Sequence, residues 1–480
     1  MHSAQTTRTQ GSILIQVMAF MSIGIVILSG FVGWSVLSVR TARHAEYREQ
    51  AIQIAEAGID YYRWHLAHAP LDYQDGTGIA GPYVHDYYDK QGNKIGSFTL
   101  DIIPPPVGST LVIIDSTGRV VSDMTVTRTI EAKLAKPSFA KFALVSNQDV
   151  WEDAVEIFGP YHSNGGVHFS NVLAHNIVTS AKTTYIDPDF GGTRWGVYTD
   201  KGTVDPAPPT ALPNRPDVFA AGRVVAVPAV DFAGMMSDLA SIKTNAQTLG
   251  LYYGPSGALG YHIVLKPTGQ FDIYRVTGKL PSPNGTCTAG FQSSDAGGDM
   301  WSINAEVLIA ANVPVPANGL VFIEDDVWVE GTINNEYITI AAARFPDNPA
   351  TRANIIVNND VRYTNVDGSD IIGLIAQNDI RVGYASADVL HIDGAIVAQS
   401  GAIWRDYYPA SCGPQNIRTR IETNGSLISN QRYTFSWWCG AFCSGYASQV
   451  SNYDANMLYR PPPSFPLTTD RYQTISWSEK

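Results

Sequence analysis

An uncharged apolar run occupies the N-terminal part of the chain. Residues 11–39 contain no Asp, Glu, Lys or Arg, and the run exceeds the roughly 20 residues with which a helix crosses the hydrocarbon core of a bilayer. Its polar residues stand singly among the apolar ones: Ser12, Gln16, Ser22, Ser29, Ser35 and Ser38. The pattern predicts a transmembrane helix over 12–39, because the apolar region of a cleaved secretory signal is shorter.

The pattern changes after this run without a proline or a cluster of turn residues. Apolar residues now recur at helical spacing between charged ones, at Ala42, Ala45, Ile52, Ala55, Ile59 and Tyr62. Such spacing is typical of an amphipathic helix. We therefore expect a second helical stretch over 40–68 that continues the first as one long rod.

Patterns typical of strands begin after the helix. Residues 94–103 and 122–134 each predict a strand, and Met124, Val126, Ile130, Ala132 and Leu134 of the second share one face. Between them, L-V-I-I-D-S-T-G-R-V-V predicts a hairpin that turns at D-S-T-G. These elements form a predicted small β region over 69–136.

A body rich in short strands follows over 137–459. It contains one predicted helix at 231–249, which Asp231 can cap and Gly250 can end. The tail over 460–480 opens with R-P-P-P-S-F-P, and its prolines exclude a central strand there. We expect this proline-rich tail to pack along the surface of the body.

An internal repeat gives the body its predicted fold. Six pieces share a short apolar strand, a polar corner and a second alternating strand, and they begin at Gly159, Gly319, Ala353, Gly373, Gly394 and Gly425. The last five begin 34, 20, 21 and 31 residues apart. A period of this size predicts a mainly β protein with a parallel β-helix-like solenoid body. Polar corner residues would sit in left-handed turns or form ladders, at Asn164, Asn358, Asn378 and Asn430. The alternative fold is a β-sandwich.

Composition narrows the function classes. The net charge is −12 and only 16% of residues are charged, so a nucleic-acid backbone is not an expected partner. The four cysteines are Cys287, Cys412, Cys439 and Cys443, and none has a His at a metal-ligand spacing. In an exported chain they predict one or two disulfides. A disulfide from Cys412 to Cys439 or Cys443 would stabilise the last coil of the repeat. Buried free thiols are the alternative.

The N-terminal residues resemble a known family. A short polar leader, 1–11, is followed by Ser12 and an apolar helix, which resembles the class III signal of type IV pilins and pseudopilins. A-I-Q-I-A-E-A-G resembles the A-x-x-A-E-A-G signature of PilX-type pilus-assembly proteins, and it contains Ala51, Ala55, Glu56, Ala57 and Gly58. The resemblance implies that a prepilin peptidase cleaves between Gly11 and Ser12. It also implies that the signature residues act in assembly with other pilin subunits.

One position departs from the family pattern. Pilins of this class usually carry Glu at the fifth mature position, which pairs with the N-terminal amine of a neighbouring subunit. Counted from Ser12, that position holds Gln16, and an amide brings no charge to offset an amine inside the membrane. The absence of this Glu is familiar in minor subunits, so the resemblance implies a minor pilin.

The predicted orientation has evidence on both sides. Arg40, Arg43 and Arg48 follow the apolar run and only Arg8 precedes it, so the positive-inside rule places the body in the cytoplasm. A cysteine-bearing body rich in Tyr and Gly is typical of an extracellular protein. We expect a single-pass membrane protein with its body outside, at the cell surface or in a pilus.

Candidate chemistry is confined to polar residues of the body. β-Helices host enzymes that cleave polysaccharides, which need converging acids or a Ca²⁺ site with an Arg base. Residues considered for these roles are Glu324, Asp325, Asp326, Glu330, Asp379, Arg381, His391 and Asp393. Solvated corners are the alternative for the acids, and structural Ca²⁺ is an alternative at E-D-D. His162 and His168 are six residues apart with no third ligand nearby, so we assign no metal to them.

The sequence as a whole predicts a protein that assembles with other subunits and does not catalyse a reaction. We expect no catalytic residue and no cofactor, and we expect a membrane-anchored minor pilin or pseudopilin-like subunit of a type IV pilus or related secretion filament. The alternative is a surface-anchored adhesion protein that binds or cleaves glycans, with Trp404, Trp437 and Trp438 as stacking platforms.

Overall fold

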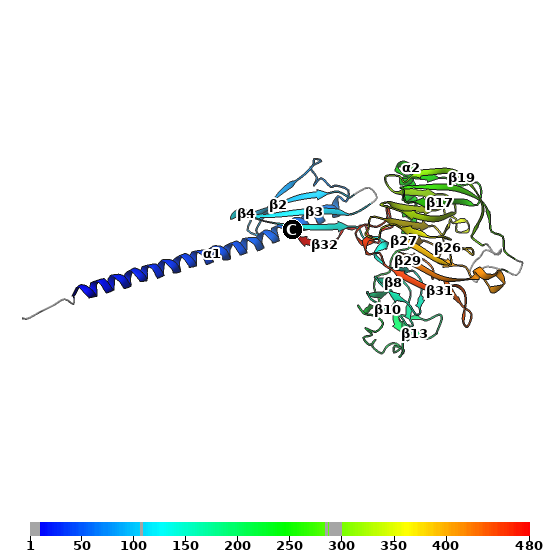
Figure 1. Ribbon diagram of the computed structural model, residues 1–480, viewed down its shortest axis with the longest axis horizontal. Coiled ribbons are helices and arrows are strands. Elements are labelled where there is room, and N and C mark those ends of the chain that lie inside the picture. Colours follow the sequence, from blue (N-terminus) through cyan, green and yellow to red (C-terminus); the bar gives the residue numbers. More distant parts are fainter. Residues whose placement is uncertain (1–9, 106–108, 284–286, 288–299) are drawn as a thin grey trace, which may run out of the picture. The chain divides into compact units, whose positions relative to one another are not determined.

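The computed structural model describes residues 10–105, 109–283, 287 and 300–480, without the side chains of 10–12 and 235–237 (Figure 1). Most of the leader predicted over 1–11 therefore lies outside the described residues. The chain divides into two compact units. Unit 1 comprises Met1–Pro104, Val112–Leu134 and Ser476–Lys480, and unit 2 comprises Pro105–Leu111 and Ala135–Ile475.

Unit 1 contains one long helix and one antiparallel sheet. Helix α1 runs without a break over Gln10–His68, which is 59 residues, because no proline and no turn cluster interrupts it. The strands are β1 (Tyr83–Tyr88), β2 (Lys94–Ile103), β3 (Val112–Val120) and β4 (Asp123–Ala135), and each pairs antiparallel with the next. The C-terminal strand β32 (Gln473–Glu479) lies beside β4 in the same sheet.

The D-S-T-G turn predicted between 94–103 and 122–134 is wrong. β3 passes straight through this segment, and Asp115–Gly118 pair with both β2 and β4. The physical reason is alternation. Val112, Ile114, Ser116 and Gly118 share the buried face of β3 with period two, and tertiary packing overrides the local turn preference of Asp and Gly.

The remaining strands and the second helix belong to unit 2. Their bounds are β5 (Leu144–Ser146), β6 (Val150–Glu152), β7 (Glu156–Ile157), β8 (Tyr161–Ser163), β9 (Val167–Phe169), β10 (Leu173–Ala174), β11 (Val178–Ser180), β12 (Thr184–Ile186), β13 (Thr193–Trp195), β14 (Val197–Thr199), β15 (Arg223–Val224), α2 (Met235–Leu249), β16 (Leu251–Tyr253), β17 (Gly260–Lys266), β18 (Gln270–Lys279), β19 (Ile303–Pro314), β20 (Leu320–Ile323), β21 (Val327–Ile333), β22 (Tyr337–Ala342), β23 (Ile355–Ile356), β24 (Val361–Tyr363), β25 (Ile371–Ala376), β26 (Ile380–Val382), β27 (Val389–Ala398), β28 (Ile403–Arg405), β29 (Ile417–Ser429), β30 (Ser436–Trp438) and β31 (Phe442–Asn452).

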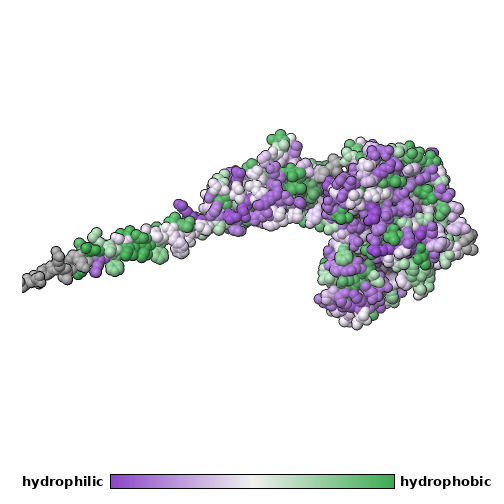
Figure 2. All heavy atoms as spheres, viewed as in Figure 1, coloured by the Kyte–Doolittle hydropathy of each residue, from purple (hydrophilic) through white to green (hydrophobic). Residues whose placement is uncertain are grey.

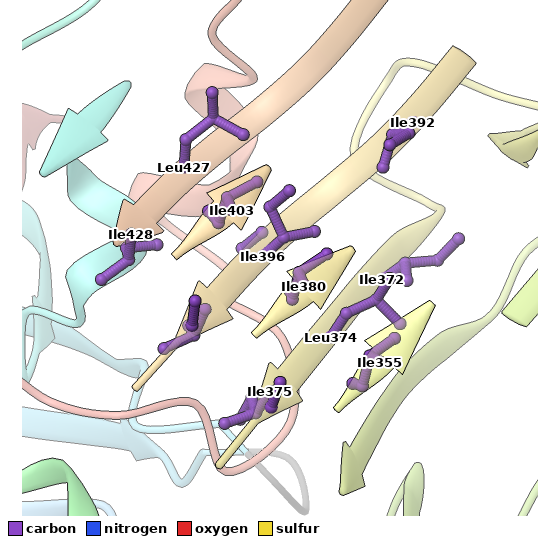
Figure 3. Packing of buried hydrophobic residues seen from close by; sticks show 14 of the residues in the cluster. Ile355, Ile372, Leu374, Ile375, Ile380, Ile392, Ile396, Ile403, Leu427 and Ile428 are labelled. Carbon is purple, nitrogen blue, oxygen red and sulfur yellow. The ribbon is translucent and has the colours of Figure 1, made fainter. Parts of the chain in front are cut away.

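Parallel pairing in register dominates unit 2. In one series of strands, Ile340 of β22 lies opposite Leu374 of β25, which lies opposite Ile396 of β27 and then Leu427 of β29. A second series stacks Ile355, Ile380 and Ile403 of β23, β26 and β28. All of these residues belong to one buried core, and Figure 3 labels each of them except Ile340. Like residues at equivalent positions therefore pack on one another from strand to strand.

These pairings confirm a mainly β protein with a long N-terminal helix and many parallel strands in a large sheet. They differ from the antiparallel neighbours of a β-sandwich. Closure of the strands into solenoid coils stays a prediction.

The register of the repeat needs one correction. The piece beginning at Ala353 supplies β23, which pairs with the second strands β21 and β26, whereas the first strand of this repeat is β22. Short isoleucine-rich strands look alike in sequence, so alternation alone did not separate first from second strands. Measured between Ile340, Leu374, Ile396 and Leu427, the spacings are 34, 22 and 31 residues.

The predicted helix at 231–249 begins four residues late, at Met235. Asp231 does not cap it directly. Its carboxylate accepts hydrogen bonds from the amides of Ala233 and Gly234, so it closes the turn that precedes α2. The prolines of the C-terminal tail lie buried on the body, where Thr339 Oγ1 donates to the carbonyl of Pro463 at 2.7 Å.

All four cysteines are paired, but Cys412 has a different partner from the one proposed. Cys412 forms a disulfide with Cys287, 125 residues away, and Cys439 pairs with Cys443 across the tip of the β30–β31 hairpin. Sequence proximity favoured a link among the last three cysteines. The fold instead brings Cys287 against Cys412 in a small buried cluster with Met300, Tyr384 and Tyr408.

Candidate functional site

The C-terminal half of α1 packs on the sheet of unit 1 through one narrow stripe. The stripe is buried and its members recur three or four residues apart, at Ala51, Ile54, Ala55, Gly58, Ile59, Tyr62 and Leu66. Such spacing places side chains on one face of a helix. Ala51, Ala55 and Gly58 of the predicted assembly signature therefore face the chain's own sheet.

Small residues allow the main chains of α1 and β3 to approach closely. A Cβ atom on Gly118 of β3 would collide with the carbonyl oxygen of Ala51 and the amide nitrogen of Ala55. A Cβ atom on Gly58 would likewise collide with Ser116 Oγ and with the ring of Phe98. Gly118 therefore has no room for a side chain against the helix main chain, and a side chain at Gly58 would have to displace Ser116 and Phe98, so the A-x-x-x-A-x-x-G spacing allows the helix to pack closely on the sheet.

The other two signature residues point elsewhere. Glu56 is exposed and Ala57 is half-buried, so both lie off the packed stripe. Their predicted role in assembly stays a prediction, and it now rests on the outer face of α1 alone.

The N-terminal half of α1 is exposed along its length. Large apolar side chains from Ile13 to Val39 are about half to three-quarters exposed, and Figure 2 shows much of this segment as hydrophobic surface. By length and composition, α1 can cross a membrane, and it is the single described helix that can. Gly11 and Ser12 lie in the first turn of α1, and the side chain of Ser12 is not among the described atoms.

The polar side chains near the apolar half of α1 differ in whether they form hydrogen bonds within the helix. The hydroxyls of Ser22, Ser29 and Thr41 donate to carbonyls of the helix itself, at 2.8, 2.8 and 3.0 Å. Gln16 is exposed and makes no described hydrogen bond. An amide in hydrocarbon without a partner is costly, so a polar group from outside the chain would stabilise Gln16 there.

The acidic corner of β20 and β21 is neutralised within the body. Glu324 accepts hydrogen bonds from Lys243, at 2.8 Å, and from Tyr252. Burial raises the pKa of Glu324, but these hydrogen bonds, the charge of Lys243 and the amide of Phe345 together outweigh burial and leave the pKa lowered. Asp325 and Asp326 both pair with Arg344. Each of the three acids therefore has a cationic partner within the body.

The other acids considered for polysaccharide cleavage do not converge either. Arg381 pairs with Asp379 at 2.7 Å and with Asp406 at 3.3 Å, and its guanidinium lies over the rings of Trp301 and Trp404. Asp393 is buried and accepts a hydrogen bond from the amide of Tyr363, and Glu330 accepts one from Asn359. His391 lies 3.3 Å from Glu422. No described contact joins Arg381 to His391 or Asp393.

The two histidines of H-S-N-G-G-V-H have separate surroundings. His162 is hydrogen-bonded to Thr179 at 2.9 Å and to Asn164 at 3.0 Å. His168 is buried between Asp187 and Asp200, 3.2 Å from each. Within the described ranges, no group of three or more His, Cys, Asp or Glu side chains is arranged to hold a metal ion.

The tryptophans considered as stacking platforms differ in exposure. Trp404 is buried, and Trp437 donates to the carbonyl of Arg405 at 2.8 Å. Trp438 is 64% exposed and meets the ring of Phe442 at an interplanar angle of 68°. The rings are T-shaped, so they do not form one flat platform.

Gly118 was the residue that sequence reasoning missed. Its signal is present in the alternation of β3, where Ser116 and Gly118 are the small members of an otherwise apolar face. Small residues on a strand and small residues at helical spacing on α1 indicate close packing only when they are read together.

Comparison with known proteins finds likeness to solved structures alone. No protein-family model and no curated protein matches the sequence. The chain is similar to the competence-associated pilin ComZ from Thermus thermophilus, with 12% identity over 91% of this chain and 98% of that chain, and a TM-score of 0.30. At this TM-score the likeness carries no weight for the fold or the function.

Proposed function

We propose that the chain is a non-enzymatic, membrane-anchored minor subunit of a type IV pilus or a related secretion filament, of the PilX type. Its helix α1 enters the filament core through the apolar half, and unit 2 is displayed outside the cytoplasm. Other pilin-like subunits are its partners, and prepilin peptidase acts on its leader.

One observation carries this proposal. A single helix of 59 residues is exposed and apolar in its first half and is seated on its own antiparallel sheet in its second half. A helix that only anchored a soluble body would need no rigid continuation into that sheet. This division supports a helix that is shared between a membrane or filament core and a folded head.

Gln16 supports the choice of a minor subunit. The amide can accept a hydrogen bond from a neighbour's N-terminal ammonium but offers it no charge. The small residues Ala19, Ser22, Ser29 and Gly33 recur at spacings that suit close helix packing in a membrane. The helix can therefore pack among other helices. It lacks the ion pair with a neighbour's N-terminal amine that would align successive copies along a filament.

The two disulfides support the proposed side of the membrane. Disulfides persist outside the reducing cytoplasm, and both pairs lie in unit 2. This favours an exterior body over the orientation that Arg40, Arg43 and Arg48 would give by charge alone.

The leader provides the experiment. Gly11→Val should block cleavage and keep the protein in the membrane and out of sheared surface filaments. Thr9→Val is the control, because it places the same valine two residues before Gly11 and should leave incorporation normal. Normal incorporation of Gly11→Val would contradict the proposal.

A second candidate function rests on the exposed Trp438. A tryptophan on a disulfide-closed hairpin can stack on a sugar ring of a surface glycan. In a glycan-array experiment Trp438→Ala would then lose binding, whereas Trp404→Phe, at a buried position, would retain it. Absence of glycan binding by the unaltered protein would remove this candidate.

A further inference from the structure

The large sheet of unit 2 has an exposed apolar edge. β17, β18 and β19 form an antiparallel ribbon, and β17 continues the sheet through parallel pairing with β21. Among the described residues, the strand pairing of β19 is with β18 alone. One side of β19, a strand of 12 residues, therefore offers its main-chain groups to a further strand.

The side chains of β19 at this edge are also exposed. Val307, Leu308 and Ile309 are 51%, 50% and 48% exposed. Within the described part of unit 2, no other three consecutive large apolar residues are exposed to this degree. Successive side chains of a strand alternate between faces, so apolar surface is open on both faces of the edge. Native proteins usually protect such edges with charges, prolines or a covering element.

The sequence of β19 is nearly a palindrome. It runs I-N-A-E-V-L-I-A-A-N-V over 303–313, and its centre is Leu308. Read outward from this centre, Val307 mirrors Ile309, Ala305 mirrors Ala311 and Asn304 mirrors Asn312. The single unlike pair is Glu306 with Ala310.

A palindromic strand is complementary to itself in antiparallel pairing. A two-fold axis at Leu308 would place Leu308 opposite the same residue of a second copy, and Val307 opposite Ile309. Cross-strand apolar pairs stabilise a sheet, and like charges directly opposite one another destabilise it. Here each Glu306 would face an alanine, and its carboxylate already meets His262 at 2.8 Å, so no acidic pair opposes the contact.

Backbone geometry limits the length of this pairing. The β18–β19 register is regular from Glu306 to Leu308, and it shifts beyond Leu308 and beyond Glu306. Asn312 has a φ of +56°, in the left-handed region that ends a regular strand. Asn312 therefore limits the pairing to residues 305–311, which is shorter than β19 itself, and the register shifts beside Leu308 and Glu306 fall within this segment.

We propose that β19 is a homotypic interface, at which two copies of this chain join their sheets by antiparallel pairing about Leu308. The interface is isologous, because the same segment contributes from each copy. It is small, so the pairing is weak in dilute solution and is favoured where a membrane concentrates the chains. The inference is independent of the filament proposal, because it concerns unit 2 alone.

The oligomeric state of the full chain in detergent tests the surface. Leu308→Lys places a charge at the centre of the edge, and the residue is half exposed in the single chain, so folding should be preserved. In sedimentation velocity the unaltered chain should show a dimer fraction that Leu308→Lys reduces at least tenfold. Leu249→Lys is the matched control, since Leu249 is 71% exposed on α2, and it should leave the dimer fraction unchanged. Equal dimer fractions for both variants, or an unaltered chain that stays monomeric at all concentrations, would overturn the proposal.

Cysteine crosslinking tests the register. Directly opposed residues of antiparallel strands are close enough for a disulfide, so Leu308→Cys should crosslink with itself. Ala305→Cys should not, because two copies of residue 305 would be about 20 Å apart, but it should crosslink with Ala311→Cys in a mixture. Efficient self-crosslinking of Ala305→Cys, or none of Leu308→Cys, would contradict the axis at Leu308.

Discussion

The main chain of α1 at Ala51 lies so close to β3 that Gly118 has no room for a side chain. Helix and strand meet here as two backbones, without an intervening layer of side chains. The contact fixes where the exposed part of α1 begins, because the buried stripe starts at Ala51. A direct backbone contact therefore divides the helix into a seated half and a projecting half.

The first prediction concerns this contact. Gly118→Ala should destabilise unit 1 by about 1–3 kcal/mol, the usual cost of overpacking a close-packed contact. Hydrogen exchange of the full chain should show faster exchange over residues 51–66 of α1. Arg119→Ala is the control, because this neighbouring side chain is exposed on the other face of β3. Unchanged protection in Gly118→Ala would show that the approach is looser than described.

The second prediction concerns Gln16 and the filament. Gln16→Glu restores a carboxylate that can pair with a neighbour's N-terminal amine, so incorporation into filaments should rise several-fold. Val17→Glu brings the same charge one residue away, where no pairing is expected, and the unpaired carboxylate should lower incorporation. Quantitative immunoblotting of sheared filaments measures both. If the two changes had equal effects, Gln16 would have no particular role in aligning the chain with neighbouring subunits.

The third prediction separates the two disulfides by the length of chain that each one closes. In the chain-entropy picture, the Cys287–Cys412 link stabilises unit 2 by roughly 5 kcal/mol and the Cys439–Cys443 link by roughly 2 kcal/mol. Their sequence separations are 125 and 4 residues. Replacing both cysteines of the long link by serine should therefore lower the unfolding temperature more than replacing those of the short link. The reverse order would contradict this ranking.

The fourth prediction concerns pH. Glu152 accepts hydrogen bonds from Tyr161, at 2.8 Å, and from Tyr433. Burial raises the pKa of Glu152, and these hydrogen bonds only partly oppose the rise. A raised pKa means that the folded chain holds its proton more tightly than the unfolded chain, so this carboxyl stabilises the fold less as pH rises above its ordinary value.

Glu152→Gln removes this titration while keeping an oxygen that can accept from a tyrosine. The stability of Glu152→Gln relative to the unaltered chain should therefore increase as pH rises above the ordinary pKa of 4.5. Glu56→Gln, at an exposed position, is the control and should show no such trend. Chemical unfolding at a series of pH values measures the difference. A difference that shrinks as pH rises would reverse the assigned direction.

Much of the architecture could be predicted because it depends on local pattern. The length of α1 follows from an apolar run and an amphipathic run with no proline between them, and β2 and β4 follow from alternation. The parallel stacking of like residues was indicated by the repeated apolar strands.

The errors arose where distant contacts decide the structure. D-S-T-G has the residues of a turn, but two neighbouring strands hold it extended in β3. Cys412 has a nearer cysteine in sequence, but the fold brings it to Cys287. The assembly role of Ala51 and Ala55 stays a prediction from a family signature, and the signature could not show that both also pack on Gly118, which lies 67 and 63 residues further along the chain.

Fewer residues of the family signature are exposed on α1 than the sequence suggested. Of the signature residues, Glu56 is exposed and Ala57 is half-buried, whereas Ala51, Ala55 and Gly58 are buried against the sheet of unit 1. This difference could not be read from the signature, because a small residue serves a close contact within a subunit as well as one between subunits.

The most direct test of the central claim is mass spectrometry of the N-terminus of the chain recovered from sheared surface filaments. The proposal predicts a mature chain that begins at an N-methylated Ser12, because removal of residues 1–11 is what admits α1 to a filament. A chain that retains Met1, or one found only in the cell membrane, would contradict assembly and indicate a simple anchor.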